Sequence, residues 1–298
     1  CSTTASQTDT SAEVTRCPSR GQCCGYPCPG VAGDRPTLAP VSKLLETNAA
    51  RTVLSVWSWI VLSVVIIVWT PMVALTRLVT APFDPAAYRA GYLFRKLTVV
   101  HEKLNPLWTF RVSGDMPDDP RRPYVVVANH ESFVDILLIS HLPFEMKWMS
   151  KADFFRYPLV GWMMQLSRDI RLERGDKKSG AKALQECRQR LGQNVSVMIF
   201  PEGTRSQTGQ LQEFKDGAFR LAIDTGVPIL PIVVVGTRDA LIKSDWRFGR
   251  SNAEVRVLEP IEIDGLTKHD VPELRDRARA AIAEGLDTLR AERSATAA

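Results

Sequence analysis

The chain has 298 residues, which is enough for one large α/β domain with an appendage or for two modest domains. Its 45% hydrophobic and 24% charged residues are ordinary for a globular protein, and its formal net charge of +5 suits anionic membranes or phosphorylated substrates as well as a plain solvated surface. The sequence has no run of lysine and arginine, no zinc finger and no basic patch interleaved with aromatic residues, so it predicts no nucleic-acid partner.

The first 40 residues form a leader rich in Cys, Ser, Thr, Gly and Pro, and five of the six cysteines lie within residues 1–28. Because the leader contains little that could be buried, we expect residues 1–40 to be disordered. The clustered cysteines could bind a metal, but no CxxC pair or local histidine completes a zinc pattern. We therefore expect no metal site.

An apolar segment follows the leader. Residues 52–76 carry no charge and lie between Arg51 and Arg77. As a helix the segment would be about 37 Å long, compared with about 30 Å for the apolar core of a bilayer. Pro71 is expected to kink or end this helix. The length and the absence of charge predict a membrane-embedded helix rather than a buried core helix, and they leave open whether it crosses the bilayer fully.

Residues 84–110 form a second, amphipathic stretch in which apolar and basic residues alternate at helical spacing. A helix of this kind can lie along a membrane surface with its basic residues near lipid phosphates, or it can pack on a catalytic domain. The pattern does not distinguish these two arrangements. We assign residues 41–110 to a membrane-associated helical segment with its apolar core at 52–76.

Strand and helix patterns alternate through residues 111–298, which we expect to form the catalytic domain. Such alternation predicts an α/β fold with a largely parallel sheet covered by helices on both faces. Sites in these sheets form at the carboxyl ends of strands. The predicted strands are Tyr124–Ala128, Lys147–Met149, Ile170–Leu172, Val195–Phe200, Ile229–Val235 and Glu254–Leu258, and the predicted helices are about 133–142, 151–167, 177–192, 215–225 and 271–292.

A histidine and an aspartate follow the first of these strands. Residues five apart on an ideal helix point about 140° away from each other, so His130 and Asp135 can meet only if the histidine lies in the loop and the aspartate in the first helical turn. Ser132 is a good N-cap for such a helix. Asp135 would then orient the imidazole as a general base. Alternatively, Ser132 and Asp135 are only a capping box and His130 is an ordinary loop histidine.

A glycine-containing turn follows a later strand, at Pro201-Glu202-Gly203-Thr204-Arg205-Ser206. Gly203 permits close backbone approach, and the guanidinium of Arg205 fits phosphate oxygens. Glu202 would repel a phosphate, so we expect it to orient Arg205 or to accept a hydrogen bond from a substrate hydroxyl. Arg174, at the end of another predicted strand, would project from the same edge of the sheet. No serine or cysteine nucleophile accompanies the histidine, which suggests that the attacking hydroxyl belongs to the substrate.

These pieces together resemble the four motifs of glycerolipid acyltransferases, in the same order. The resemblance covers about residues 50–265 and is to the 1-acylglycerol-3-phosphate (lysophosphatidic acid) acyltransferase family. The residues that carry it are Asn129-His130 with Asp135, Arg174 after a short strand, Phe200-Pro201-Glu202-Gly203-Thr204-Arg205-Ser206, and Val227-Pro228-Ile229-Leu230-Pro231.

The resemblance implies transfer of a fatty acyl group from acyl-CoA or acyl carrier protein to the sn-2 hydroxyl of lysophosphatidic acid, giving phosphatidic acid. His130 and Asp135 would form the catalytic dyad. The enzyme would need no metal or redox cofactor, and it would work at a lipid bilayer with its catalytic domain on the cytoplasmic face. The residues expected to hold the acceptor are Glu202, Gly203, Thr204, Arg205 and Arg174.

Other functions remain open. The acceptor could be glycerol 3-phosphate, another lysophospholipid or an acylated amino lipid, or the chain could be a catalytically silent membrane-surface protein. A serine hydrolase is disfavoured because the sequence has no Gly-x-Ser-x-Gly elbow, and no phosphate-binding loop supports nucleotide hydrolysis. Trp162, Met163 and Met164 could border an acyl tunnel or simply pack in the core.

Overall fold

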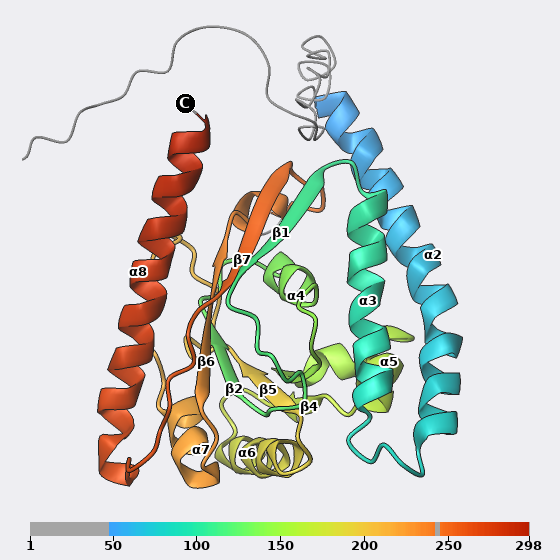
Figure 1. Cartoon of the computed structure of the whole chain (residues 1–298). Helices are drawn as coiled ribbons and strands as arrows, with labels where there is room; N and C mark the ends of the chain where they lie inside the picture. Colours follow the sequence, from blue (N-terminus) through green and yellow to red (C-terminus); the bar gives the residue numbers. More distant parts are fainter. Residues whose placement is uncertain (1–47, 242–244, 298) are drawn as a thin grey trace, which may run out of the picture. The chain divides into compact units, whose positions relative to one another are not determined.

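The computed structural model describes residues 48–241 and 245–297 (Figure 1). The predicted leader at residues 1–40, with its cysteine cluster, lies outside these residues. The fold described below belongs to one compact unit that contains both the apolar segment and the predicted catalytic domain.

A seven-stranded sheet forms the centre of this unit, with the strand order β1-β7-β6-β2-β5-β3-β4. Neighbouring strands are parallel except β6 and β7, which are antiparallel. The prediction of a largely parallel sheet is therefore confirmed. The strands are β1 (Trp108–Gly114), β2 (Val125–Ala128), β3 (Met146–Lys151), β4 (Ile170–Leu172), β5 (Ser196–Ile199), β6 (Ile229–Val235) and β7 (Ser251–Val257).

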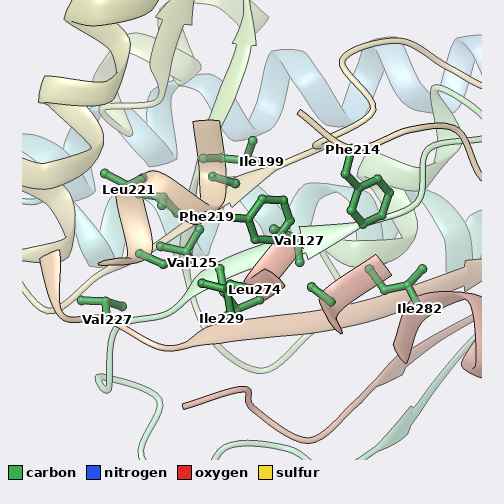
Figure 2. Close-up of a cluster of buried hydrophobic side chains, with 14 of the residues drawn as sticks. Val125, Val127, Ile199, Phe214, Phe219, Leu221, Val227, Ile229, Leu274 and Ile282 are labelled. Atoms are coloured by element: carbon green, nitrogen blue, oxygen red, sulfur yellow. The ribbon is translucent and has the colours of Figure 1, made fainter. Parts of the chain in front are cut away.

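Helices cover both faces of the sheet, and the central strand β2 contributes to both cores. Val125 and Val127 pack with residues of α6, α7 and α8 on one face (Figure 2), whereas Val126 and Ala128 pack with α4 on the other. This alternation is the period of two expected for a strand buried on both sides. The helices are α2 (Asn48–Thr80), α3 (Tyr88–Leu104), α4 (Val134–Ile139), α5 (Val160–Leu166), α6 (Lys177–Leu191), α7 (Gly217–Thr225) and α8 (Val271–Ala297).

The structure differs from the prediction at one helix and one strand. The helix predicted over residues 151–167 is divided into a 3-10 helix, Ala152–Arg156, and α5, because Pro158 falls between them. Strand β1 was not predicted, and its first residues, 108–110, were assigned to the amphipathic stretch. β1 lies at the end of the sheet and only Trp108 within it is buried, so the strand lacks the continuous apolar run that marks β2 or β6.

The apolar segment forms helix α2, and the prediction that Pro71 could end it is wrong. The helix continues to Thr80 with Pro71 inside it. Val65 precedes the proline and Val73 follows it, and both are buried in one cluster with residues of α3 and α5. Packing on both sides of Pro71 thus holds the helix together despite the lost backbone hydrogen bond. Within the described residues, α2 is the one helix long and apolar enough to cross a membrane, and only 22% of its most apolar stretch is buried.

The amphipathic stretch forms helix α3, which lies between α2 and the sheet (Figure 1). Its buried residues include Ala90, Gly91, Arg95 and Leu97. Of the two arrangements that the sequence allowed, the structure has the one in which this helix packs on the catalytic domain.

A buried group of four charges joins α3 to the sheet. Lys147 of β3 donates to Glu145 at 2.8 Å and to the carbonyl of Ala87 at 2.9 Å. Arg95 of α3 pairs with Asp169 and lies 3.7 Å from Glu145. Burial raises the pKa of Glu145 and lowers that of Lys147, because both lose water that would stabilise their charges. The two cations and two carboxylates compensate one another, so removal of one partner would leave a buried charge unpaired.

Gly91 allows this contact between α3 and the buried charges. A Cβ at Gly91 would overlap with Glu145 Oε1 and lie 2.5 Å from Lys147 Nζ. The absence of a side chain lets the backbone of α3 approach the pair closely.

We expect Gly91→Ala to destabilise the fold by about 3–5 kcal/mol, the usual cost of breaking a buried ion pair. Gly180→Ala is the matched control. Gly180 lies within α6 with nothing within 4 Å of the added Cβ, so this change should stabilise the helix by up to about 1 kcal/mol. The measurement is thermal or denaturant unfolding of the full chain in detergent. Equal effects of the two substitutions would contradict the role given to Gly91.

Candidate active site

The two signature stretches leave neighbouring parallel strands at the same edge of the sheet. Val127 of β2 pairs with Ile199 of β5, and the histidine stretch and the glycine turn follow directly. Two hydrogen bonds then join the loops: Ser206 N–H donates to the carbonyl of His130 at 2.8 Å, and His130 N–H donates to Glu202 Oε1 at 2.8 Å. The stretches therefore form one local structure at the carboxyl ends of the strands.

Asn129 fixes the point at which the chain leaves β2. Its side-chain amide donates to the carbonyl of Val234 and accepts from Val234 N–H, both at 2.8 Å. The amide thus replaces a backbone partner for β6, so the N–H and carbonyl of Val234 stay paired where the chain turns away. This role was not predicted from the sequence.

His130 and Asp135 meet as the expected geometry requires, with the histidine in the loop and the aspartate in the first turn of α4. His130 Nδ1 lies 2.8 Å from Asp135 Oδ2, and the ring stacks on Phe200 with centroids 3.9 Å apart. These contacts place the proton on Nδ1 and leave the lone pair on Nε2, an assignment made from the partners. Nε2 has no hydrogen-bond partner among the described residues.

The carboxylate of Asp135 is fully buried and accepts from three further donors. The N–H groups of Glu131 and Ser132 lie 2.7 and 2.9 Å from Oδ2, and the hydroxyl of Thr237 donates to Oδ1. Asp135 therefore both ties down the loop, as a capping residue would, and holds the imidazole. Phe133 rather than Ser132 occupies the N-cap position, although Ser132 Oγ accepts from Val134 N–H at 3.3 Å.

Glu202 is buried, and its position corrects the expectation that it would orient Arg205. Besides His130 N–H, its carboxylate accepts from the side-chain amide of Gln212 at 2.9 Å. Burial raises the pKa of Glu202, while these donors act against that shift. Glu202 thus organises the loop around the histidine, and Arg205 is not among its hydrogen-bond partners.

Gly203 has a φ of 73°, in the left-handed region that favours glycine. A Cβ there would lie 2.6 Å from the Nζ of Lys215, so this ammonium group lies over the backbone of the turn. Thr204 is exposed beside the turn, with its hydroxyl 3.5 Å from Gln212.

A cavity of about 820 Å³ is lined by both stretches. Arg205 lines it, is exposed, and has no hydrogen-bond or ion-pair partner among the described residues. Arg238 and Arg290 also line the cavity, and Arg290 lies 3.1 Å from Glu131. These two arginines come from the segment after β6 and from α8, outside any motif, so the sequence carried no signal for them.

Arg174 does not reach this cavity. It is exposed at the end of β4, and β5 and β3 separate that strand from β2. Arg205 lines the cavity and Arg174 does not. His130 and Asp135 are also absent from its lining, to which their loop contributes Glu131 and Ser132. Because β4 is parallel to its neighbours, Arg174 follows it at the same edge of the sheet, as predicted, and its role in binding the acceptor stays a prediction.

A second, apolar cavity of about 180 Å³ lies between α4 and the helices α2, α3 and α5. Phe133, two residues before Asp135, lines it together with Phe94 of α3 and Met164 of α5. Of the other residues considered for an acyl tunnel, Met163 is a fully buried core residue and Trp162 is 56% exposed. The cavity connects the surroundings of the dyad with the apolar helices.

Comparison with known proteins agrees with this geometry. Residues 109–235 match the acyltransferase family, and the solved crystal structure of the 1-acyl-sn-glycerophosphate acyltransferase PlsC from Thermotoga maritima superposes with a TM-score of 0.68. That match has 26% sequence identity and covers 81% of this chain and 96% of the bacterial one. Residues 109–235 therefore carry an acyltransferase domain.

The chain is similar to enzymes named 1-acyl-sn-glycerol-3-phosphate acyltransferases. It is 35% identical to the chloroplastic enzyme LPAT1 of Arabidopsis thaliana over 208 residues, which are 69% of this chain and 56% of the relative. It is 39% identical to the human alpha enzyme over 186 residues, which are 62% of this chain and 66% of the relative. The chain thus spans between about half and two thirds of the length of these curated relatives.

Glu131 provides a test of the site's electrostatics. Burial, with a contribution from the charge of Asp135, raises its pKa from 4.5 to about 7, although Arg290 acts in the opposite direction. Between pH 4.5 and 7 the unfolded chain loses this proton while the folded chain keeps it, so stability falls as the pH rises. Glu131→Gln should remove this fall.

The measurement is the Tm of wild type and variant between pH 4.5 and 8. We expect the wild-type Tm to decrease relative to that of Glu131→Gln as the pH rises to 7. Glu284→Gln, at an exposed position of α8, controls for the loss of a carboxylate. Parallel pH profiles for wild type and Glu131→Gln would exclude the raised pKa.

Proposed function

We propose that this chain is a membrane-bound O-acyltransferase. It transfers a fatty acyl group from an acyl thioester to the sn-2 hydroxyl of 1-acylglycerol 3-phosphate and so forms phosphatidic acid. The observation that carries the proposal is the buried hydrogen bond of 2.8 Å between His130 and Asp135, which leaves Nε2 unpartnered in the loop joined to the Arg205 turn. The named activity of the similar enzymes supports the same reaction.

In the proposed reaction His130 acts as a general base. Nε2 takes the proton from the sn-2 hydroxyl as that oxygen attacks the thioester carbonyl. The new C–O bond forms, the C–S bond breaks, and the imidazolium returns the proton to the departing thiolate. Asp135 stabilises the imidazolium through Nδ1. General-base catalysis of this kind contributes about 10²–10⁴ to the rate.

The acceptor's phosphate binds at the turn of residues 202–205 in this proposal. Arg205 offers an unpaired guanidinium at the cavity, and the open backbone of Gly203 permits a close approach. Thr204 flanks the phosphate, and Glu202 acts by shaping the loop. Holding the phosphate orients the hydroxyl toward His130. Arg174 stays a prediction from the family resemblance, since it lies outside the cavity.

The apolar cavity would hold an acyl chain. Its lining combines side chains near the dyad with side chains of α2, α3 and α5, so a chain could extend from the reacting carbonyl toward the apolar helices. The donor is acyl-CoA or acyl-ACP as co-substrate, and the proposed chemistry uses no metal or redox cofactor.

Helix α2 is proposed to lie in one leaflet. Near its start, Arg51 donates to the carbonyl of Phe248 at 3.0 Å, and Trp59 donates to that of Trp246 at 3.0 Å. Near its end, Val73 packs in the cluster that includes Met163 of α5. Because the catalytic domain packs along much of the helix, lipid can surround only its outer side. The catalytic domain would face the cytoplasm, where acyl-CoA and acyl-ACP are found.

An acceptor panel tests the reaction directly. Purified protein would be given one labelled acyl-CoA with lysophosphatidic acid, glycerol 3-phosphate, lysophosphatidylcholine or an acylated amino lipid. The proposal expects turnover with lysophosphatidic acid above the others. Preference for another acceptor would identify that acceptor as the substrate. Absence of turnover with every donor and acceptor would favour a catalytically silent membrane-surface protein.

His130→Ala should lower kcat by about 10²–10⁴, because the general base is lost. His269→Ala, at an exposed position far along the chain, is the matched control and should keep the wild-type rate. Single-turnover kinetics with lysophosphatidic acid would measure both. Near-native transfer by His130→Ala would show that another group removes the proton.

Arg205→Gln should raise the KM for lysophosphatidic acid about 10- to 100-fold, the range expected for losing a hydrogen bond to a charged group. The KM for the acyl donor should change little. A separate comparison is the neutral acceptor monoacylglycerol, whose slow transfer should be insensitive to this substitution. An unchanged KM for lysophosphatidic acid would show that the phosphate does not bind at this turn.

A further inference from the structure

A third cavity, of about 380 Å³, lies beside β4, the edge strand farthest from β1. Three guanidinium groups line it, and Phe155 and Gln165 complete most of its wall. None of its residues lines the cavity that contains Arg205, whereas Asp169 also lines the apolar cavity proposed for the acyl chain. The three arginines are Arg168, Arg171 and Arg190.

Each arginine comes from a different element. Arg168 follows α5 in a left-handed conformation, with φ of 58°, and its carbonyl accepts from Arg190 Nε at 3.3 Å. Arg190 lies on α6 and is only 8% exposed. Arg171 extends from β4. Local folding thus brings three cations together around one concavity.

Nearby carboxylates compensate these charges only in part. Asp169 lines the cavity, and its Oδ1 accepts from Arg95 and from Trp148 N–H, while its buried Oδ2 has no hydrogen-bond partner among the described residues. Arg171 pairs with Glu173 at 3.6 Å, and both side chains are about half exposed, so this pair contributes little. The cluster therefore has capacity for a further anion.

The excess of positive charge acts on the buried guanidinium of Arg190. Burial lowers its pKa, and the neighbouring charge of Arg168 lowers it further, although Glu186 and Asp169 act in the opposite direction. An anion held between the guanidinium groups would relieve the repulsion.

The cavity is lined in part by the segment that packs on the apolar helix α2. The segment that supplies Phe155 and Gln165 also carries Tyr157 and Trp162, which are 57% and 56% exposed. Helix α5 of this segment packs on α2 through Met163. Exposed Tyr and Trp side chains favour the headgroup region of a bilayer, where arginines meet lipid phosphates.

We propose that this cavity binds the phosphate of an anionic phospholipid headgroup through Arg168, Arg171 and Arg190. The lipid would sit at the membrane surface, at a site separate from the one proposed for acyl transfer. The inference rests on the proposed membrane position of α2 and does not depend on the acyl transfer itself.

The test is thermal unfolding of the full chain in mixed micelles that contain phosphatidylglycerol, with phosphatidylcholine as the neutral reference. Phosphatidylglycerol should raise the Tm by about 5 °C or more once its concentration reaches 100 times Kd. Arg168→Gln/Arg171→Gln should abolish that rise. Both positions are at least partly exposed, so the variant should fold, and Arg190 is left in place because it is buried.

Matched variants separate the possible sources of the effect. Arg220→Gln/Lys182→Gln removes the same charge at exposed positions of α7 and α6 and should keep the rise in Tm. Arg205→Gln should also keep it. Loss of the rise in Arg205→Gln would place the lipid in the proposed active site and overturn the proposal.

Two further outcomes would also overturn it. The first is a rise in Tm that survives in Arg168→Gln/Arg171→Gln. The second is an equal rise with inorganic phosphate alone, which would identify a free-phosphate site instead of a lipid site. Acyl transfer is measured separately with the same variants, so a failure of the proposed reaction would not be confused with a failure of this site.

Discussion

The arrangement of the candidate site depends on one buried carboxylate. Asp135 has no contact with solvent, so its oxygens must be satisfied within the protein. Its donors are the ring of His130, two N–H groups of the adjoining loop and the hydroxyl of Thr237 after β6. The dyad can therefore form only when β2 and β6 lie side by side, which makes the orientation of the imidazole a product of the whole sheet.

The same dependence explains why an acidic residue sits in a turn proposed to bind phosphate. Glu202 accepts the N–H of His130, and Ser206 donates to the carbonyl of the same histidine. Two loops far apart in the sequence are thus joined by hydrogen bonds to the backbone of His130. The carboxyl group of Glu202 faces into this junction and toward Gln212, while Arg205, at the cavity, has no partner among the described residues. Glu202 and Arg205 thus have separate roles mainly because their side chains point into different surroundings.

Much of this was predictable from local pattern. The buried strands β2 and β6, the apolar helix and the loop-to-helix placement of His130 and Asp135 all follow from periodicity and helix geometry. The rest depends on contacts between distant segments. Helix α2 passes Pro71 because packing on α3 and α5 outweighs a local preference, and no motif marks Thr237, Arg238 or Arg290. From the sequence alone, Gly91 only lowers the helix propensity of its segment. Its role becomes clear from the buried charges beside it.

The buried charges beneath Gly91 also bear on how the chain could be engineered. Arg95 lies on α3 and Ala87 directly precedes this helix. Arg95 donates to Asp169, and the carbonyl of Ala87 accepts from Lys147 of the sheet. Removing the two helices to obtain a water-soluble fragment would expose Lys147, Glu145 and Asp169 on an apolar surface, without the partners that Arg95 and Ala87 supply. Helices α2 and α3 thus form part of the wall of the sheet domain, and a usable soluble version would need those polar groups redesigned at the same time.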